Sequence, residues 1–157
     1  MSVMVVLGGG GHSFEMIKIL ENIHLKDNLI FVLNHDDHYT PVKRNGSRVY
    51  RLLRPRKPLE YGVKTFFRFI LSFLNALFLL IWTRPKIILT NGPSISVPLT
   101  IIGWLLRARI IFVESICRVY RLSLSGRLLL PLINLFIVQW PYLKKYSSKI
   151  IYGGRIF

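Results

Sequence analysis

Cysteine is almost absent from this chain, because Cys117 is the single one among 157 residues. One cysteine can form neither an intrachain disulfide nor a metal site built from paired cysteines, so a small secreted disulfide scaffold is excluded. The sequence also lacks internal repeats and low-complexity segments, and its composition excludes a coiled coil. Hydrophobic residues make up 52% and aromatic residues 13%, which suits a buried core and not a disordered chain. The length then predicts one domain over residues 1–157.

Acidic residues are scarce as well: seven Asp and Glu stand against 22 Lys and Arg, which gives a formal net charge of +15. None of the acids lies between Asp37 and Glu60, and none follows Glu114. So large an excess of positive charge on an apolar chain predicts an anionic partner: nucleic acid, anionic lipid or a phosphorylated substrate. The first acid-free stretch makes up most of a basic loop over residues 39–60.

Uninterrupted hydrophobic runs are short. The run Phe69–Thr83 has fifteen residues without a charge, fewer than the roughly 20 that a membrane-spanning helix needs. The uncharged stretch between Lys86 and Arg107 is longer, but Asn91-Gly92-Pro93 breaks it. The chain also opens without a basic region before its first apolar run, so we expect no signal peptide and a cytosolic location.

Short apolar runs alternate with segments of helical spacing along the whole chain. This alternation predicts an α/β fold with a mostly parallel sheet flanked by helices. The expected strands are residues 3–7, 28–33, 48–53, 86–90, 110–113, 136–138 and 149–152, and the expected helices are residues 14–23, 63–82, 96–106 and 122–135, the last with a break at Pro131.

A glycine-rich segment, Gly8–Gly11, lies between the first expected strand and the first helix and is followed by His12 and Ser13. Bare backbone N–H groups at a helix N-terminus favour a phosphate or diphosphate ligand, although a tight turn that needs glycine is the simpler alternative. The segment matches a dinucleotide fingerprint only in part, because Ser13 occupies its last glycine position. A neutral imidazole at His12 could act as general base toward a hydroxyl, or could only cap or pack the helix.

Polar residues also follow other strands, where open α/β sheets place their ligands. They include Asn91-Gly92-Pro93 and Glu114, although Glu114 could instead pair with Arg118 four residues later. His35-Asp36-Asp37-His38 could hold a ribose hydroxyl or a metal ion. Neighbouring residues at a strand end point apart, however, so we expect a solvated loop there and no metal site.

The basic loop 39–60 precedes the apolar helix 63–82. Its cations and tyrosines could bind RNA, but no RNA-binding motif is present, and the aromatic residues of the helix favour an anionic membrane. We therefore expect a membrane contact and no nucleic acid partner, while part of the helix must be core. The residues predicted to face the membrane are Arg48, Arg51, Arg54, Arg56, Lys57, Phe66, Phe67 and Phe73.

Several segments together resemble the asparagine-linked glycosylation 14 family, the membrane-anchoring subunit of a split UDP-N-acetylglucosamine transferase. They occur in family order over nearly the whole chain, and VESICRV followed by LSLSG and FIVQWP is the most specific part. The segments are LGGGGHSFEM (7–16), NGPSISVP (91–98), VESICRV (113–119), LSLSG (122–126), FIVQWP (136–141) and GRI (154–156).

The resemblance implies the amino-terminal, Rossmann-like half of a GT-B glycosyltransferase that is divided between two chains. This chain would hold the lipid acceptor, and a soluble subunit of the asparagine-linked glycosylation 13 type would bind the donor UDP-N-acetylglucosamine. Together they would add the second N-acetylglucosamine to dolichyl-diphospho-N-acetylglucosamine on the cytosolic face of the endoplasmic reticulum. Inversion at the anomeric carbon, no cofactor and no activity for the single chain are implied too. A Rossmann oxidoreductase and a polysaccharide-biosynthesis subunit with another acceptor stay open as alternatives.

The same resemblance assigns roles to residues. His12 would be the base, Gly8–Gly11 and Ser13 would face the acceptor diphosphate, and Asn91, Gly92, Glu114 and Arg118 would line the same cleft. The tail residues Gly154, Arg155, Ile156 and Phe157 would dock on the partner subunit. Many family members carry a transmembrane helix before the first strand and this sequence shows none, so we expect peripheral or shallow membrane attachment.

Overall fold

The computed structural model describes residues 2–23, 28–42, 46–55 and 62–156. These residues contain one seven-stranded sheet with the order β3-β2-β1-β4-β5-β6-β7, in which every neighbouring pair is parallel. The strands are β1 (Ser2–Val6), β2 (Asn28–Asn34), β3 (Arg48–Leu52), β4 (Ile87–Thr90), β5 (Arg109–Val113), β6 (Leu135–Val138) and β7 (Ile150–Tyr152). The strand order reverses between β1 and β4, which is where such sheets open a crevice for ligands.

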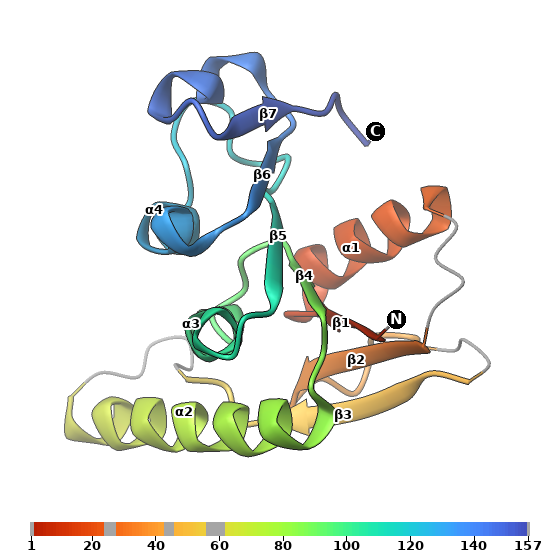
Figure 1. Ribbon diagram of the computed structural model, residues 1–157, viewed down its shortest axis with the longest axis vertical. Helices are drawn as coiled ribbons and strands as arrows, with labels where there is room; N and C mark the ends of the chain where they lie inside the picture. Colours follow the sequence, from red (N-terminus) through yellow and green to blue (C-terminus); the bar gives the residue numbers. More distant parts are fainter. Residues whose placement is uncertain (1, 24–27, 43–45, 56–61, 157) are drawn as a thin grey trace.

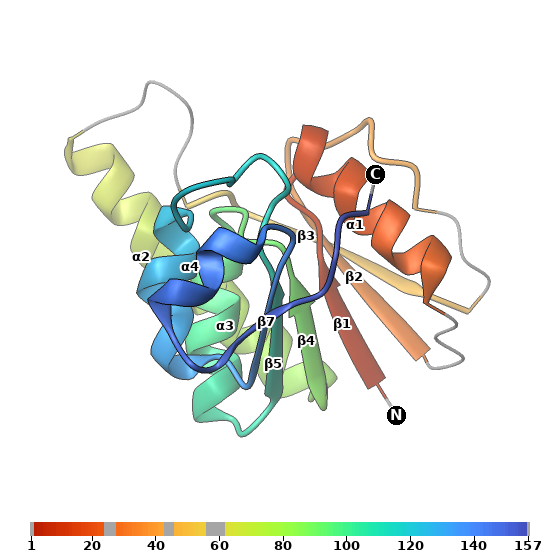
Figure 2. The same cartoon turned by 90° about the horizontal axis from the view of Figure 1, so that it is seen from above.

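Helices cover the two faces of the sheet unequally (Figure 1). Helix α1 (Gly10–Asn22) lies on one face, and α2 (Val63–Thr83), α3 (Ser96–Leu105) and α4 (Leu124–Leu129) lie on the other. Two 3₁₀ helices, η1 (Leu130–Leu132) and η2 (Pro141–Tyr146), flank β6. Figure 2 shows the segment after β7 crossing the face that carries α1. The predicted Rossmann-like α/β fold, with a parallel sheet flanked by helices, is confirmed.

The predicted helix over residues 122–135 is wrong in its extent. Helix α4 begins after Ser123, whose Oγ accepts a hydrogen bond of 2.9 Å from the Gly126 N–H. It ends at Leu129 because Pro131 lacks an N–H and forces the tighter η1 turn. Leu135 already belongs to β6. A buried helix and a buried strand are both continuously apolar, so hydropathy alone could not place this boundary.

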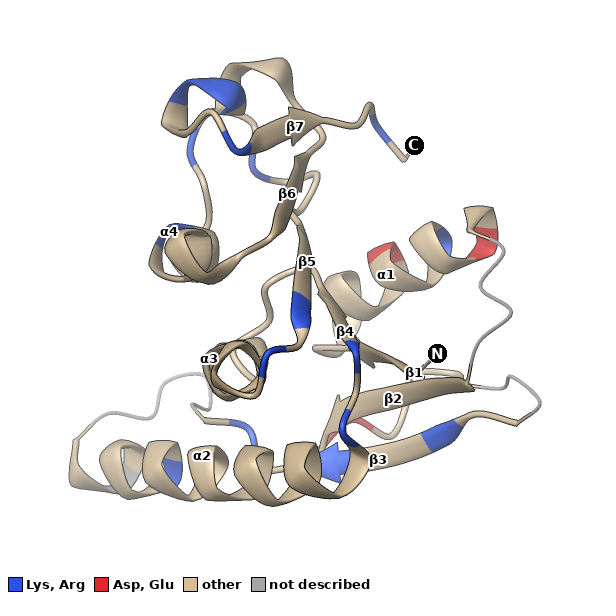
Figure 3. Cartoon of the chain, viewed as in Figure 1, with Lys and Arg blue, Asp and Glu red and all other residues tan. Residues whose placement is uncertain are grey.

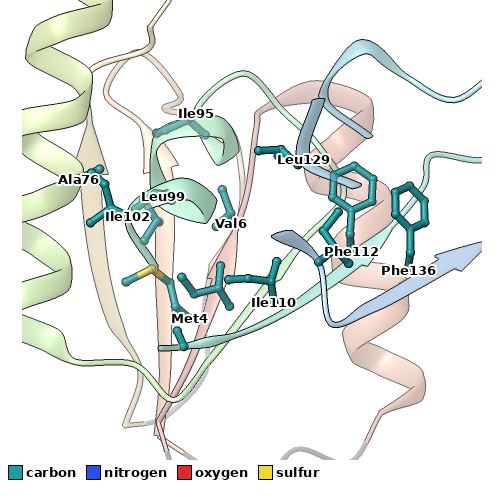
Figure 4. Packing of buried hydrophobic residues seen from close by; sticks show 14 of the residues in the cluster. Met4, Val6, Ala76, Ile95, Leu99, Ile102, Ile110, Phe112, Leu129 and Phe136 are labelled. Carbon is teal, nitrogen blue, oxygen red and sulfur yellow. The ribbon is translucent and has the colours of Figure 1, made fainter. Parts of the chain in front are cut away.

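The core lies mainly between the sheet and α3. Figure 4 shows Met4, Val6 and Ile110 of the sheet facing Leu99 and Ile102 of α3. All five side chains are buried, and the ring centroids of Phe112 and Phe136 lie 4.7 Å apart beside them. Because the central strands are covered on both faces, they read in the sequence as continuous apolar runs.

Helix α2 combines a core contact with a broad apolar outer surface. Ala76 and Leu80 are fully buried, and the helix packs against α3. Its segment Thr65–Thr83 has a mean hydropathy of 1.9 and is long and apolar enough to cross a membrane by length and composition. The uncharged run Phe69–Thr83 is shorter than this segment because the helix continues through Arg68.

Candidate functional site

The glycine segment closely approaches the loop after β4 at the carboxyl edge of the sheet. A Cβ added at Gly8 would lie 2.1 Å from Cβ of Pro93, so no larger residue fits there. The carbonyl oxygen of Gly8 accepts a hydrogen bond of 2.7 Å from the amide of Asn34 at the end of β2. Gly8 therefore serves the packing of two loops and does not by itself indicate a ligand.

The next two glycines shape the turn into α1. Gly9 and Gly10 have φ angles of 79° and 57°, a region that side chains disfavour. The N–H of Gly9 donates to Oγ of Ser13 at 2.8 Å, and Ser13 is buried. Ser13 is thus engaged inside the loop, and its contact with a diphosphate stays a prediction. Helix geometry leaves the N–H groups of Gly10, Gly11 and His12 for an anion at the positive end of α1.

A pair of alanine substitutions separates the two roles of the glycines. Gly8→Ala should lower the free energy of unfolding by about 1–3 kcal/mol, because Pro93 must move to admit the new methyl group. Gly11→Ala should leave it unchanged or raise it by less than about 1 kcal/mol, because nothing lies within 4 Å of its added Cβ and alanine favours a helix. Urea unfolding of both variants measures the difference. Equal losses of unfolding free energy in the two variants would contradict the conclusion that Gly8 packs against Pro93 whereas a side chain at Gly11 meets no neighbour.

His12 stands in the first turn of α1 and is only partly exposed. Its carbonyl oxygen accepts a hydrogen bond of 2.8 Å from the Asn91 amide, which fixes the start of the helix against the end of β4. Among the described residues, none hydrogen-bonds to its buried Nδ1 atom. Burial lowers the pKa of His12 below its ordinary value of 6.5, although the negative charge of Glu15 opposes that shift. The imidazole is therefore neutral near pH 7 and can accept a proton.

A buried polar network lies directly beneath this helix start. Its centre is Glu15, a buried residue whose Oε1 accepts hydrogen bonds from the Gln139 amide at 2.6 Å and the Ile116 N–H at 2.7 Å. Its Oε2 accepts from the Asn91 amide at 3.2 Å. Gln139 also donates to the carbonyl oxygen of Glu114 at 3.0 Å. One carboxyl group thus joins α1 to the carboxyl ends of β4, β5 and β6.

Glu114 and Gly92 have structural contacts that the sequence did not indicate. Glu114 is fully buried, and its oxygens accept from the N–H groups of Ser115 and Ser123 and from the Ser123 hydroxyl. Burial raises the pKa of Glu114, which these hydrogen bonds partly offset. The side chain therefore holds the loop before α4 and has no surface for a ligand. Gly92 has a φ of 83°, and a Cβ there would lie 2.7 Å from Cζ of Phe112.

Arginines surround the glycine loop from two sides. Arg118 is exposed, and its positive charge lowers the pKa of both His12 and Glu114. The predicted ion pair between Arg118 and Glu114 is not among the described salt bridges. Nη2 of Arg54 lies 3.8 Å from the Cβ position of Gly9 and 3.4 Å from Oδ1 of Asp36. Arg54 therefore belongs to the rim of this site rather than to the membrane surface that the sequence predicted.

The segment after β2 forms a turn. Oδ1 of Asp37 accepts from the N–H groups of Tyr39 and Thr40, and its Oδ2 accepts from the Thr40 hydroxyl. In the part of the chain that the structure describes, no three His, Cys, Asp or Glu residues are grouped to hold a metal ion. The carboxylates of this segment are thus engaged with their own loop and with Arg54.

The other described residues that were predicted to face a membrane divide into two groups. Arg48 and Arg51 on β3 are exposed, as are Phe66 and Phe67 on α2. Phe73 is instead packed against the core, and its ring centroid lies 5.0 Å from that of Phe69. Arg56 and Lys57 lie outside the described residues.

The tail folds back over the sheet. Its Ile156 N–H donates to Oε1 of Gln139 at 3.2 Å, and the Ile156 side chain packs half-buried against strand residues. The Arg155 guanidinium lies 5.2 Å from the Trp140 ring centroid. Ile156 is therefore partly covered by this chain itself, and Phe157 lies outside the described residues. Gln139 links this tail to Glu15 beneath His12.

Glu15, Gln139 and Asn34 were not among the residues that the sequence predicted for the site. Glu15 and Gln139 lie inside the quoted motifs LGGGGHSFEM and FIVQWP, which was the available signal. Each is a polar residue among apolar neighbours, a pattern that predicts a buried hydrogen bond but does not identify its partner. Their partners lie as many as 124 positions away in the sequence.

Comparison with known families gives a match over nearly the entire chain. The sequence model of the family described as "Oligosaccharide biosynthesis protein Alg14 like" matches residues 3–156. The UDP-N-acetylglucosamine transferase subunit ALG14 of Homo sapiens is 31% identical, with 99% of this chain and 83% of that protein covered. The protein of the same name from Debaryomyces hansenii is 36% identical, with 97% and 75% covered.

Among solved structures, Acinetobacter baumannii MurG superposes with a TM-score of 0.78 over 96% of this chain. The identity is 13%, so the likeness concerns the fold alone. The chain spans 44% of the length of that structure, less than half of it.

Proposed function

This chain belongs to the Alg14-like family of oligosaccharide biosynthesis proteins, and we propose that it is the acceptor-binding subunit of a two-chain UDP-N-acetylglucosamine transferase. The observation that carries the proposal is the neutral, unpaired His12 at an open helix N-terminus, within a chain that matches this family from residue 3 to residue 156. Family membership favours this role over the nucleotide-dependent oxidoreductase. The proposed reaction adds the second N-acetylglucosamine to dolichyl-diphospho-N-acetylglucosamine at the cytosolic face of the endoplasmic reticulum.

In the proposed reaction His12 acts as general base. The acceptor hydroxyl attacks the anomeric carbon of the donor, its proton passes to the imidazole, and UDP leaves with the electrons of the broken C–O bond. Attack opposite the leaving group inverts that carbon. The acceptor diphosphate would lie at the N–H groups of Gly10 and Gly11, with Arg54 and Arg118 as counter-charges. The lowered pKa of His12 keeps the base unprotonated at neutral pH.

The acceptor itself can be tested directly. Purified complex of this chain with a donor-binding subunit should transfer labelled N-acetylglucosamine to dolichyl-diphospho-N-acetylglucosamine. Lipid-diphosphate acceptors with a different first sugar should give at least tenfold less product. Preference for another sugar would favour the polysaccharide-biosynthesis alternative and overturn the proposed acceptor.

The pH dependence of transfer follows from the lowered pKa of His12. Its base form persists as the pH falls, until the pH reaches the pKa in the folded protein, which lies below 6.5. The acid limb of kcat/KM should therefore have its midpoint below pH 6.5, with activity present above that midpoint and lost beneath it. A midpoint above 6.5 would contradict the proposed environment of the imidazole.

The partner subunit would dock beside the tail. On the face that carries α1, the strands β4, β5 and β6 line an apolar cavity of about 380 Å³ together with Gly153, Gly154 and Ile156. Ile87, Leu89, Ile111, Val113 and Ile137 supply most of its floor. An apolar hollow at the sheet face suits a hydrophobic element of a donor-binding chain.

Deleting residues 154–157 is expected to abolish co-purification of the donor-binding subunit, because the rim of this cavity is lost. The substitution Ile156→Asp should weaken the complex at least tenfold, since it places a charge in the cavity. Lys149→Gln, an exposed change just before β7, serves as the control and should leave the complex intact. Co-purification that survives the deletion would remove the tail from the interface.

We also propose that α2 contacts the membrane as an interfacial helix. Its outer surface carries ten exposed large apolar side chains, from Val63 to Trp82, whereas Ala76, Leu79 and Leu80 hold it to the core. Crossing a bilayer would require these buried residues to leave the core. Lying along the surface exposes nothing new and buries the outer side chains among lipids.

A further inference from the structure

A second cluster of cations lies at the edge of the sheet opposite the glycine loop. Here α2 leads into β4 and α3 leads into β5, and a hollow of about 700 Å³ opens between these connections. Arg84, Lys86, Arg107 and Arg109 line it, above apolar side chains that include Leu80 and Leu106. Figure 3 shows blue segments at these two connections.

These four cations lack acidic counterparts in the part of the chain that the structure describes. The ion pairs found there are Lys18 with Glu21 and Arg54 with Asp36, and no acidic residue lines the hollow. Cations near helix C-termini are favoured by the helix dipole, which accounts for Arg84 and Arg107. It does not account for Lys86 and Arg109, which lie side by side at the amino ends of β4 and β5, where the Arg109 N–H donates to the Lys86 carbonyl oxygen.

The backbone at this hollow is unusual too. Within the described residues, Arg84 and Arg107 are the two non-glycine residues with positive φ, at 42° and 62°. Both follow a helix C-terminus, where glycine is the ordinary residue for this conformation. An arginine there is strained relative to glycine, whereas the dipole of the preceding helix favours its positive charge.

Exposed apolar side chains border the hollow. Ile81, Trp82, Trp104 and Leu105 are exposed on the ends of α2 and α3 that border it. Tryptophan and cationic side chains together are characteristic of the membrane interface, where indoles lie among headgroups and cations bind lipid phosphates. RNA would be an unsuitable ligand for so apolar a rim, and the acceptor site lies at the other edge of the sheet.

We propose that this hollow binds the phosphate headgroup of an anionic membrane lipid. The site rests on the proposed membrane contact of α2 and gives it a lipid preference. Binding there places the carboxyl-terminal end of α2 at the depth of the headgroups. The site does not contact the glycosyl acceptor, so it should affect attachment of the chain to the membrane and not the transfer step.

The test is flotation of the full chain with vesicles of phosphatidylcholine, with or without 30% phosphatidic acid, at about 0.1 M salt. The wild-type chain should prefer the anionic vesicles. In Lys86→Gln/Arg109→Gln the partition coefficient for these vesicles should fall roughly 30-fold, because each cation at the surface contributes about a factor of five. The control Lys144→Gln/Lys145→Gln removes the same charge from η2 and should keep the preference.

A second double variant tests the two arginines with positive φ without adding backbone strain. Arg84→Asn/Arg107→Asn should fold, since asparagine tolerates positive φ, and it should show a similar loss. Circular dichroism confirms the fold of each variant. If both variants of the hollow bind the anionic vesicles as well as the wild-type chain does, the proposed lipid site is overturned, whereas the membrane contact of α2 is left intact. An equal loss of binding in the η2 control would show that net charge alone explains the effect and would overturn the lipid site. Failure of the wild-type chain to bind either kind of vesicle would overturn both proposals.

Discussion

Replacing His12 with alanine is expected to lower the turnover of the proposed two-chain transferase by at least about a hundredfold. The imidazole is half-buried, held neutral, and placed by the hydrogen bond between its carbonyl oxygen and Asn91, so its removal takes the base and leaves the helix start in place. The measurement is initial-rate transfer of N-acetylglucosamine at saturating donor and acceptor, with the complex purified intact.

The selectivity of this effect matters more than its size. Binding of the partner subunit and of vesicles should change by less than about twofold in His12→Ala, because His12 lies on neither proposed surface. Lys18→Ala, an exposed change on the same helix, should leave all three properties unchanged. Equal losses of turnover, partner binding and vesicle binding in His12→Ala would make His12 a structural residue and leave the reaction without its base.

Replacing Glu15 with alanine is expected to produce the largest loss of stability. The substitution leaves the Ile116 N–H and one N–H of each of the Gln139 and Asn91 amides buried without an acceptor. Each such group costs about 1–3 kcal/mol, so a loss on the order of 3 kcal/mol or more in the free energy of unfolding should follow. Denaturant unfolding at pH 7 measures it. A loss smaller than about 1 kcal/mol would show that water or a rearranged loop replaces the carboxyl group.

Glu15→Gln separates support of the fold from positioning of His12. One oxygen of the new amide can still accept from Ile116 and Gln139. Its NH₂ group faces the Asn91 amide, which must rotate to present Oδ1 and then no longer donates to the His12 carbonyl oxygen. We expect a stable protein with reduced kcat. Loss of the nearby negative charge should also lower the pKa of His12 further and shift the acid limb of its pH profile downward.

The sequence was sufficient to predict the α/β fold because the central strands are short, continuous apolar runs that alternate with segments of helical spacing. The glycine segment and His12 were predicted at the start of α1, and the structure places them there. The boundary between α4 and β6 was not, since the chain is apolar on both sides of it and only the η1 turn at Pro131 divides them. Length and hydropathy do not distinguish one long helix from a short helix, a turn and a strand.

The polar contacts of the site could be predicted much less well. Ser13, Gly92 and Glu114 stand in family motifs, which made them candidates for ligand contacts, yet each is explained by packing or by hydrogen bonds inside the protein. Arg54 was assigned to the membrane because it lies in a basic run, whereas the fold brings it beside Gly9. Such assignments depend on contacts between β1, β3, β4 and β5, which a linear pattern does not contain.

The central claim is that this chain supplies the acceptor half of a transferase whose donor half lies on another chain. It is tested most directly by purifying this chain and a donor-binding subunit separately and measuring transfer of radiolabelled N-acetylglucosamine from its UDP ester to dolichyl-diphospho-N-acetylglucosamine. We expect no product from either chain alone and product when the two are mixed, with His12→Ala in this chain abolishing it. Product from a single chain, or none from the mixture, would contradict this division of the transferase.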